Sequence, residues 1–230
     1  MLKNKWPLVA VISLSFLSGT SALALSENMK LGADGRSVAP SLLVAAKSAD
    51  AEDKLSQGSK TLIEDIASRG IGFLADKSLT QDKREAEFRK LLNDNFDMDT
   101  IGRFALGRFW RTTSDVQKKE YLKLFNEMIV RVYTARFREY NGQTLEVKAT
   151  RKDGEGSDAI VSSLLVPNKG EQAVAIDWRV RLKNGKFKVV DIIVEGVSMA
   201  LTQRSDFASV IQRGGGDVDV LLETLRSSNK

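Results

Sequence analysis

Histidine and cysteine are both missing from this sequence, and each absence removes whole classes of chemistry. Without histidine the chain has no imidazole base, no Ser-His-Asp relay and no histidine ligand for a metal. Without cysteine it has no disulfide, no thiol nucleophile, and no thiolate site for zinc or an iron–sulfur cluster. A carboxylate-only site for magnesium or calcium stays open, although no D-x-[DN]-x-[DN]-G loop supports one.

A strong excess of one charge is also lacking. The 230 residues include 35 Lys and Arg against 30 Asp and Glu, which gives a net charge of +5. Proteins that bind nucleic acid usually concentrate basic residues on one face, so this weak balance predicts no nucleic-acid partner. The composition, 42% hydrophobic and 28% charged, is ordinary for one well-packed domain.

The first 24 residues have the pattern of a secretory signal peptide. Lys3 and Lys5 form a positive start, residues 8–17 are a short apolar run, and Ala22-Leu23-Ala24 is a small-x-small cleavage site. The apolar run is shorter than the ~20 residues that span a bilayer, which disfavours the alternative of an uncleaved anchor. We therefore predict cleavage after Ala24 and a periplasmic protein whose stability comes from its core rather than from disulfides.

Apolar residues at helical spacing follow a polar leader. Residues 25–58 are rich in Ala, Ser, Gly and charge, which favours a flexible leader. A single domain is then predicted at 59–229. Its first helices are predicted at 59–76, 80–95, 98–109 and 114–140. Ser114-x-x-Gln117 is a capping box for the last of these, and Asn141-Gly142 is expected to end it.

The apolar pattern changes to period two after residue 142. Four runs predict strands at 143–152, 158–166, 173–182 and 186–195. Asn184-Gly185 between the last two runs is a strong signal for a type I′ hairpin. Two more helices are predicted at 201–213 and 217–227. The fold class is therefore α+β: N-terminal helices, a four-stranded antiparallel sheet and two C-terminal helices.

The two-residue turn also predicts which residues of the last two strands lie opposite each other. The expected pairs are Leu182 with Phe187, Val180 with Val189, Trp178 with Asp191, and Ile176 with Ile193. Asp191 would then lie on the apolar face of the sheet, opposite Trp178, unless a bulge shifts the register.

The stretch Gly196-Val197-Ser198-Met199-Ala200 resembles a nucleophile elbow with Ala in the last place. Such an elbow belongs to a parallel α/β sheet and needs a histidine, and neither is expected in this chain. A Ser–Lys dyad has little support, because the S-x-x-K pattern at Ser227–Lys230 lies at the extreme C-terminus. We therefore predict that Ser198 caps the following helix and is not a nucleophile.

Asp191 is the one polar group in this region that could carry chemistry. A carboxyl group on an apolar sheet face can act as a general base. The alternative, which we favour, is a buried aspartate that bonds to local backbone, to an arginine or to a tyrosine hydroxyl.

The predicted elements carry more apolar surface than one layer of helices obviously covers. The runs 158–166 and 186–195 are apolar on both faces, and the helix 114–140 has a broad apolar face. Either both sheet faces are covered, or apolar surface lines a cavity.

Two groups of residues resemble motifs of the MlaC-like family, also called the toluene-tolerance auxiliary proteins. The tract 190–199, followed by Thr202-Gln203-Arg204 and Phe207, is similar to the C-terminal signature of that family. Leu106-Gly107-Arg108-Phe109-Trp110-Arg111 is similar to its LG-x-x-W element. The resemblance covers about residues 59–227.

This resemblance implies a periplasmic phospholipid carrier that catalyses no reaction and uses no cofactor. Members of the family hold acyl chains in an apolar cavity between a curved sheet and helices. They shuttle lipid between an inner-membrane MCE-type ABC transporter complex and an outer-membrane lipoprotein–porin complex. From their facing directions, we expect lipid contacts at Phe73, Leu106, Phe125, Ile129, Tyr133, Ile176, Trp178, Val180, Val189, Ile193, Val197 and Met199.

Two alternatives stay open at this point. The first is a small-molecule enzyme on a cone-shaped α+β fold, with Asp191 as general base and Tyr133 as hydrogen-bond donor. The second is the same carrier fold loaded with a hopanoid-type lipid. Solvent extraction of the purified protein, followed by mass spectrometry, separates these alternatives from a phospholipid carrier.

Overall fold

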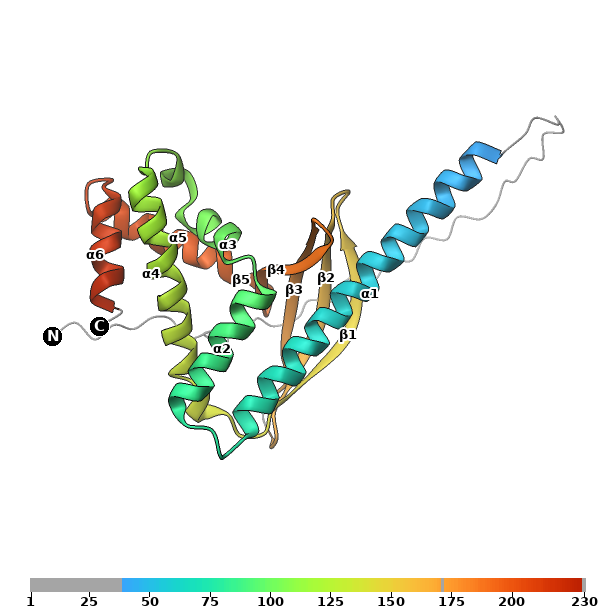
Figure 1. The fold of residues 1–230 in the computed structure, drawn as a ribbon, viewed down its shortest axis with the longest axis horizontal. Helices are drawn as coiled ribbons and strands as arrows, with labels where there is room; N and C mark the ends of the chain where they lie inside the picture. Colours follow the sequence, from blue (N-terminus) through green and yellow to red (C-terminus); the bar gives the residue numbers. More distant parts are fainter. Residues whose placement is uncertain (1–38, 171, 229–230) are drawn as a thin grey trace, which may run out of the picture. The chain divides into compact units, whose positions relative to one another are not determined.

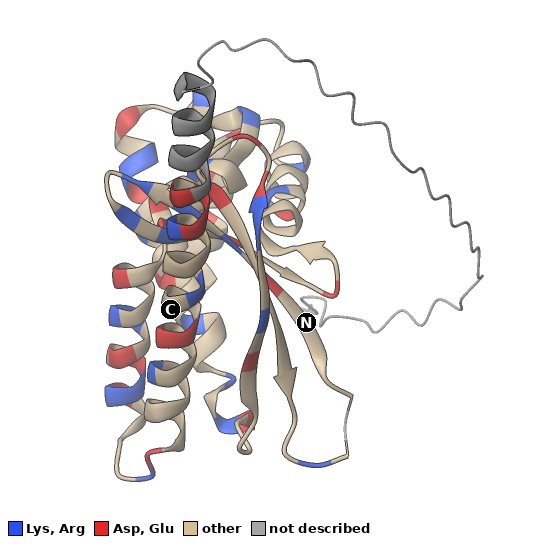
Figure 2. Cartoon of the chain, turned by 90° about the vertical axis from the view of Figure 1, so that its right-hand side faces the viewer, with Lys and Arg blue, Asp and Glu red and all other residues tan. Residues whose placement is uncertain are grey.

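Helices precede and follow an antiparallel sheet in the computed structural model, which describes residues 39–170 and 172–228 (Figure 1). The predicted signal peptide and residues 25–38 of the predicted leader lie outside the described residues. Apart from Ala39, the described residues belong to one unit of the chain, Pro40–Lys230. Acidic and basic residues are interspersed along the helices that face the viewer in Figure 2.

The helices agree with the predicted order, and their bounds differ most at the start of the first helix and at the end of the fourth. They are α1 (Ala39–Ala75), α2 (Gln81–Asn95), α3 (Met98–Leu106), the 3-10 helix η1 (Gly107–Arg111), α4 (Asp115–Thr134), the 3-10 helix η2 (Phe137–Glu139), α5 (Met199–Arg213) and α6 (Val218–Ser228). The first helix starts at Ala39 rather than near Ser59, so the described part of the predicted leader is helical. Leu55 and Ser59 on this helix are both buried.

The predicted capping box of α4 is present, whereas the predicted end of this helix is wrong. The backbone N–H of Gln117 donates to the Ser114 hydroxyl oxygen at 3.3 Å, and the N–H of Ser114 donates to the Gln117 side-chain oxygen at 3.0 Å. The helix ends at Thr134, before Asn141-Gly142. The tighter turn η2 then places the Phe137 ring 5.7 Å from that of Phe73, so tertiary packing ends the helix early.

The sheet has the predicted antiparallel meander and one short additional strand. The strands are β1 (Thr144–Asp153), β2 (Asp158–Val166), β3 (Val174–Lys183), β4 (Lys186–Val194) and β5 (Val197–Ser198), and they lie in sequence order. The hairpin turn has φ of 53° at Asn184 and 74° at Gly185, which agrees with the predicted type I′ turn.

A β-bulge changes the register of β3 and β4 part-way along the hairpin. Leu182 pairs with Phe187 and Val180 with Val189, as predicted. Beyond them the register shifts, and the pairs are Arg179 with Asp191, Trp178 with Ile192, and Ile176 with Val194. The predicted pairs of Trp178 with Asp191 and of Ile176 with Ile193 are therefore wrong. Because a shift of one residue moves side chains to the other face, Asp191 and Ile193 face away from Trp178.

Two separate apolar clusters hold the domain together. The first, the α3–α6 core, consists of side chains from α3, α4, α5 and α6. The second, the α1–sheet layer, lies between α1, α2 and the sheet face that carries Trp178. Its buried members are Ile63, Ile66, Phe73, Leu91, Val161, Trp178, Val180 and Val189. A ligand between sheet and helices would therefore meet the α1–sheet layer.

The two motifs that carry the family resemblance meet at Gly107. This residue has φ 60° and ψ −131°, a combination that is open mainly to glycine. A Cβ atom at position 107 would lie 2.8 Å from the Nε atom of Arg204 in the C-terminal motif. The guanidinium of Arg204 also lies 5.3 Å from the centre of the Phe104 ring. The absence of a side chain at Gly107 thus allows α5 to approach η1 closely.

Replacing Gly107 by alanine should destabilise the domain by about 1–3 kcal/mol, because it adds both backbone strain and a clash with Arg204. The control is Gly154→Ala, which also has a positive φ, 69°, but no neighbour within 4 Å. Urea denaturation followed by circular dichroism measures both variants. Equal stability of the two variants would show that the contact with Arg204 is unimportant.

Candidate lipid-binding site

The α1–sheet layer is the candidate site, and its walls follow directly from the sequence pattern. Strand β3 alternates apolar and charged residues, so Ile176, Trp178 and Val180 share the face that α1 covers. On α1, Ile63 and Ile66 recur at helical spacing and point into the same layer. Partly buried side chains surround this centre: Leu62, Leu74, Leu79, Phe88, Phe96, Phe137, Leu145, Val147, Ile176, Phe187 and Ile192.

Trp178 presents an apolar surface because its one polar atom is bonded inside the sheet. The indole Nε1–H donates to the hydroxyl of Ser163 at 3.0 Å. That hydroxyl in turn donates to the carbonyl oxygen of Ile176 at 2.9 Å. With these groups paired, the ring offers carbon surface to the layer and needs no polar partner from a ligand.

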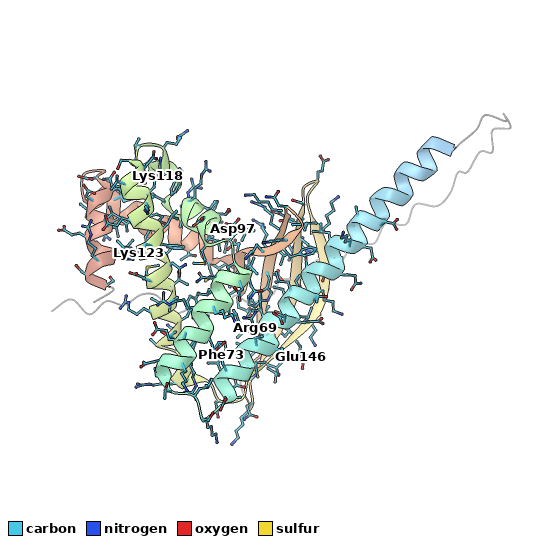
Figure 3. All side chains as sticks on the ribbon, viewed as in Figure 1. Arg69, Phe73, Asp97, Lys118, Lys123 and Glu146 are labelled. Carbon is cyan, nitrogen blue, oxygen red and sulfur yellow. The ribbon has the colours of Figure 1, made fainter. Side chains whose placement is uncertain are left out.

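Aromatic rings close one end of the layer, where α1 leads into α2. The Phe137 ring lies 5.7 Å from Phe73 and 5.2 Å from Phe88, and Phe88 lies 6.2 Å from Tyr133. Figure 3 shows Phe73 near the junction of α1 and α2, and Asp97 beyond the other end of α2. Arg84 also donates to the carbonyl oxygens of Phe73 and Asp76, which fixes this junction.

The other end of the layer, beside the β3–β4 hairpin, is open. A pocket of about 620 Å³ lies there, lined by Gly58, Thr61, Leu62, Asp65, Asn93, Asp94, Lys186, Phe187 and Lys188. A second pocket of about 470 Å³ adjoins it, lined by Asn93, Phe96, Asp97, Met98, Asp99, Asn126, Arg181, Lys183, Asn184, Lys186 and Lys188. The Phe187 ring packs so closely on Gly58 that a Cβ atom there would lie 2.2 Å from the ring.

Arg69 links the two helices that cover the layer. Its guanidinium lies 3.4 Å from the carboxylate of Asp65 on α1 and 3.5 Å from that of Asp94 on α2. Exposed ion pairs of this length contribute at most about 1 kcal/mol. This ion pair therefore adds little to the apolar packing that holds α1 against α2 and the sheet.

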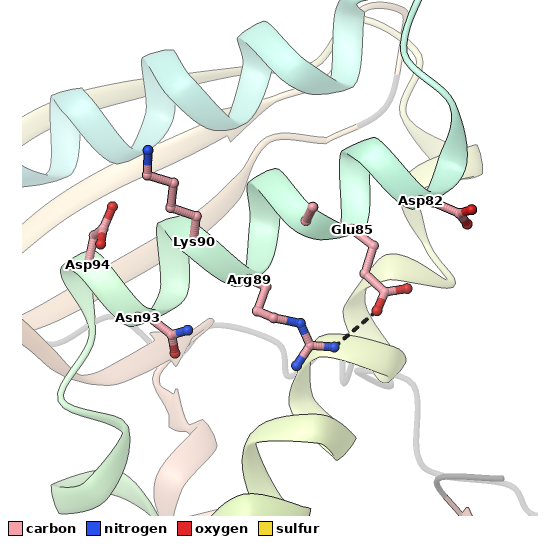
Figure 4. Close-up of a pocket in the computed structure, with 7 residues that line it drawn as sticks. Asp82, Glu85, Arg89, Lys90, Asn93 and Asp94 are labelled. Carbon is pink, nitrogen blue, oxygen red and sulfur yellow. Dashed lines mark hydrogen bonds and ion pairs between the residues drawn. The ribbon is translucent and has the colours of Figure 1, made fainter.

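A third pocket, of about 510 Å³, lies on a charged face of α2 (Figure 4). Its lining residues are Asp82, Glu85, Ala86, Arg89, Lys90, Asn93 and Asp94. Arg89 pairs with Glu85 across it at 3.0 Å. This is a solvated helix face with i,i+4 ion pairing, and it offers little for an acyl chain.

The predicted lipid contacts fall into separate groups. Five of them lie in the α1–sheet layer: Phe73, Ile176, Trp178, Val180 and Val189. Three lie in or against the α3–α6 core: Leu106, Phe125 and Ile129. The structure thus places the two sets in different clusters. Helical periodicity shows which face of a helix is apolar but not which element covers it, so the sequence alone does not separate the two sets.

The remaining predicted contacts lie at the margins of the α1–sheet layer or on the sheet face that points away from Trp178. Ile193 faces away from Trp178, and its place in the layer is taken by Ile192, which the prediction missed because of the bulge. Val197 is 54% exposed, and Met199 is half-buried where α5 begins. Tyr133 contacts the aromatic end through Phe88 but is 41% exposed.

Asp191 and Ser198 together cap α5. The Ser198 hydroxyl accepts the N–H of Leu201 at 3.1 Å, which confirms the predicted cap. It also donates to Oδ2 of Asp191 at 2.6 Å, and Oδ1 of Asp191 accepts the N–H of Ala200 at 3.1 Å. The buried aspartate is thus bonded to local backbone, as favoured, and both its oxygens are engaged. The carboxylate beside Ser198 is therefore part of the helix cap.

Within residues 39–170 and 172–228, no three acidic side chains gather in a way that could hold a metal ion. None of the helices in that part of the chain is both long and apolar enough to cross a membrane.

Comparison with known proteins agrees with this geometry. The family model described as MlaC protein matches residues 64–227, most of the domain. The chain belongs to the MlaC protein family. The matched residues include the sheet and most of the helices described above.

Individual MlaC relatives are distant in sequence. The intermembrane phospholipid transport system binding protein MlaC of Haemophilus influenzae is 22% identical over 134 residues, 57% of this chain. The toluene tolerance protein ttg2D of Pseudomonas putida is 24% identical over 135 residues, 58% of this chain. The chain spans about three-fifths of the length of these two relatives, 62% in each case.

One solved structure shows the same fold with a ligand. The phospholipid-binding protein of Ralstonia solanacearum, in complex with a phospholipid, is 25% identical and superposes with a TM-score of 0.62. The match covers 76% of this chain and 96% of that one. The fold of this chain is therefore one that holds a phospholipid in a related protein.

Proposed function

We propose that this chain is a periplasmic phospholipid carrier whose acyl-chain site is the α1–sheet layer. The observation that carries the proposal is the wall around Trp178, where apolar side chains gather and the indole N–H is bonded internally. Membership of the MlaC family and the phospholipid complex of the Ralstonia solanacearum protein support it. No catalysed reaction is part of the proposal.

Energetics explain why such a wall suits a carrier. Each buried methylene contributes about 0.8 kcal/mol, so two acyl chains with roughly thirty methylenes contribute on the order of 24 kcal/mol. A lipid leaves a bilayer for a protein only if the protein covers nearly all of that surface. A wall of Ile, Val, Phe and Trp whose indole N–H is bonded within the sheet provides such cover.

Binding requires that α1 and the sheet move apart. In this structure the layer is filled by its own side chains, with Phe187 packed on Gly58 at the open end. Because an exposed ion pair such as that of Arg69 with Asp94 adds little to holding α1 against α2, α1 is the wall that we expect to move. We propose that the loaded carrier exchanges lipid with an inner-membrane MCE-type ABC transporter complex and an outer-membrane lipoprotein–porin complex.

Lipid extraction tests the proposal directly. The protein is purified without detergent from a periplasmic extract, extracted with chloroform and methanol, and analysed by mass spectrometry. We expect diacyl phospholipid at close to one molecule per protein. Recovery of a hopanoid in its place would support the carrier fold but contradict the phospholipid assignment. Absence of any lipid, together with failure to take up lipid from vesicles, would overturn the proposal.

A further inference from the structure

Like charges face each other at the open end of the α1–sheet layer. On either side of the β3–β4 turn, Lys183 lies directly opposite Lys186, and Arg181 lies directly opposite Lys188. Directly opposed like charges destabilise an antiparallel pair. Unfavourable pairs of this kind are found mainly at functional sites. We therefore expect an anionic partner that offsets the repulsion between these cations.

Two of the four cations already have partners. Arg181 donates two hydrogen bonds of 2.7 Å to the carboxylate of Asp158, and these bonds raise the pKa of its guanidinium. Lys188 donates to the carbonyl oxygens of Asn93 and Asp94, at the negative end of the α2 dipole. Arg181 therefore ties β3 to β2, and Lys188 ties β4 to the end of α2.

The other two cations, Lys183 and Lys186, are exposed. In the part of the chain that the structure describes, neither makes an ion pair or a side-chain hydrogen bond. Lys186 lines both pockets at this end of the layer, and Lys183 lines the second one.

The acidic side chains near these lysines are mostly engaged elsewhere. Asp65 and Asp94 share the guanidinium of Arg69. Asp97 accepts from the N–H and hydroxyl of Thr100 at the start of α3. Asp99 also lines the second pocket. Among the described residues, no carboxylate lies within ion-pair distance of Lys183 or Lys186, so both ammonium groups are available to a ligand beside these acidic side chains.

The direction of the layer places a headgroup beside them. Aromatic rings close the layer at Phe73 and Phe137, so a lipid cannot extend out of the layer at that end. The methyl ends of its acyl chains therefore point toward these rings. The polar part of the same lipid must then leave the layer at the hairpin, past Phe187 and Lys186.

We infer that Lys183 and Lys186 hold the phosphate of the bound lipid, an assignment that rests on the proposed carrier function. Ammonium groups are effective partners for phosphate oxygens, and a phosphate between two lysines removes the repulsion across the turn. Because every glycerophospholipid carries a phosphate on its glycerol, the site selects phospholipids as a class over neutral lipids such as diacylglycerol.

The test compares a phospholipid with a lipid that lacks the phosphate. Delipidated protein is incubated with vesicles of phosphatidylethanolamine and phosphatidylglycerol that contain a small fraction of diacylglycerol, then separated and analysed by mass spectrometry. We expect the K183E/K186E variant to bind about tenfold less phospholipid than the unmodified protein and an unchanged amount of diacylglycerol. The K183R/K186R variant keeps both charges and should retain phospholipid.

A matched charge change elsewhere on the surface controls for a general electrostatic effect. The K119E/K123E variant makes the same charge change on α4 and should bind phospholipid normally.

An equal loss of both lipids in K183E/K186E, or unchanged phospholipid binding, would overturn the assignment while leaving the carrier function standing. If the unmodified protein binds neither lipid, both proposals fail. Titration with inorganic phosphate tests whether the two lysines bind free phosphate instead of a lipid. If K183E/K186E loses phosphate binding but keeps lipid binding, the lysines form an anion site unrelated to lipid, and the assignment is wrong.

Discussion

Replacing Ile192 by glutamate should strip bound lipid from the purified protein, whereas the same substitution at Ile193 should leave the lipid in place. The two residues are neighbours on β4 and are both partly buried. Because of the bulge, Ile192 lies opposite Trp178 in the α1–sheet layer, and Ile193 lies opposite Asp177 on the other face. The pair therefore tests which sheet face contacts lipid, with the chemical change held constant.

The expected loss at Ile192 is large because a carboxylate would lie against acyl chains. An unpaired charge in such a setting costs several kcal/mol, and 1.4 kcal/mol already corresponds to a factor of ten in affinity. We expect at least about a tenfold fall in the ratio of lipid to protein after solvent extraction. Ile192→Leu, which conserves volume, should bind lipid normally.

Circular dichroism shows whether each variant is folded before its lipid is counted. Equal lipid occupancy of the two glutamate variants would mean that the Trp178 face is not the binding surface. Val180 is less suitable for this test, although it was predicted as a contact from the sequence. Val180 is fully buried, so a glutamate there would unfold the domain. The variant would then lose lipid because it is unfolded, which says nothing about the binding surface.

The register of the hairpin shows how far local sequence rules extend. The Asn184-Gly185 turn fixes the pairs next to it, and the prediction holds as far as Val180 and Val189. The bulge that follows has no glycine or proline to mark it, because it falls among Val189, Val190 and Asp191. One extra residue was enough to move Asp191 and Ile193 to the other face.

The division into two cores could not be predicted for a different reason. Periodicity identifies the apolar face of a helix but not the element that covers it. Leu106 and Phe125 were correctly identified as inward-facing, yet they pack against α5 and α6 and not against the sheet. Similarly, the composition of residues 39–58 suggested a leader, whereas Leu55 and Ser59 are buried on α1. Sparse apolar residues on one face of a helix give little compositional signal.

The motif residues were easier to identify than to interpret. Gly107 and Arg204 stand in separate motifs, and only the structure shows that a side chain at position 107 would displace the arginine. Ser198 was predicted as a cap from its place before a helix, and that role is confirmed. The contribution of Asp191 to the same cap required the shifted register.

Replacing Asp191 by alanine should lower the free energy of unfolding by about 2–4 kcal/mol without reducing lipid binding by the folded protein. The variant loses the hydrogen bonds from the Ser198 hydroxyl and from the N–H of Ala200. Hydrogen bonds to a charged group contribute about 1.5–3 kcal/mol each, and the N–H of the buried Ala200 would be left unpaired. Urea denaturation measures the stability, and extraction at low temperature measures the lipid.

Two further variants separate the cap from any catalytic role. Ser198→Ala removes one capping group and should cost about 1 kcal/mol. Asp191→Asn can still accept from the N–H of Ala200 and, by donating to the Ser198 oxygen, should recover most of the lost stability. A general base would behave differently, because the asparagine variant would be stable yet inactive in any reaction that used the carboxylate. Normal stability of the alanine variant would contradict the cap, whereas loss of lipid from its folded form would place Asp191 in the binding site after all.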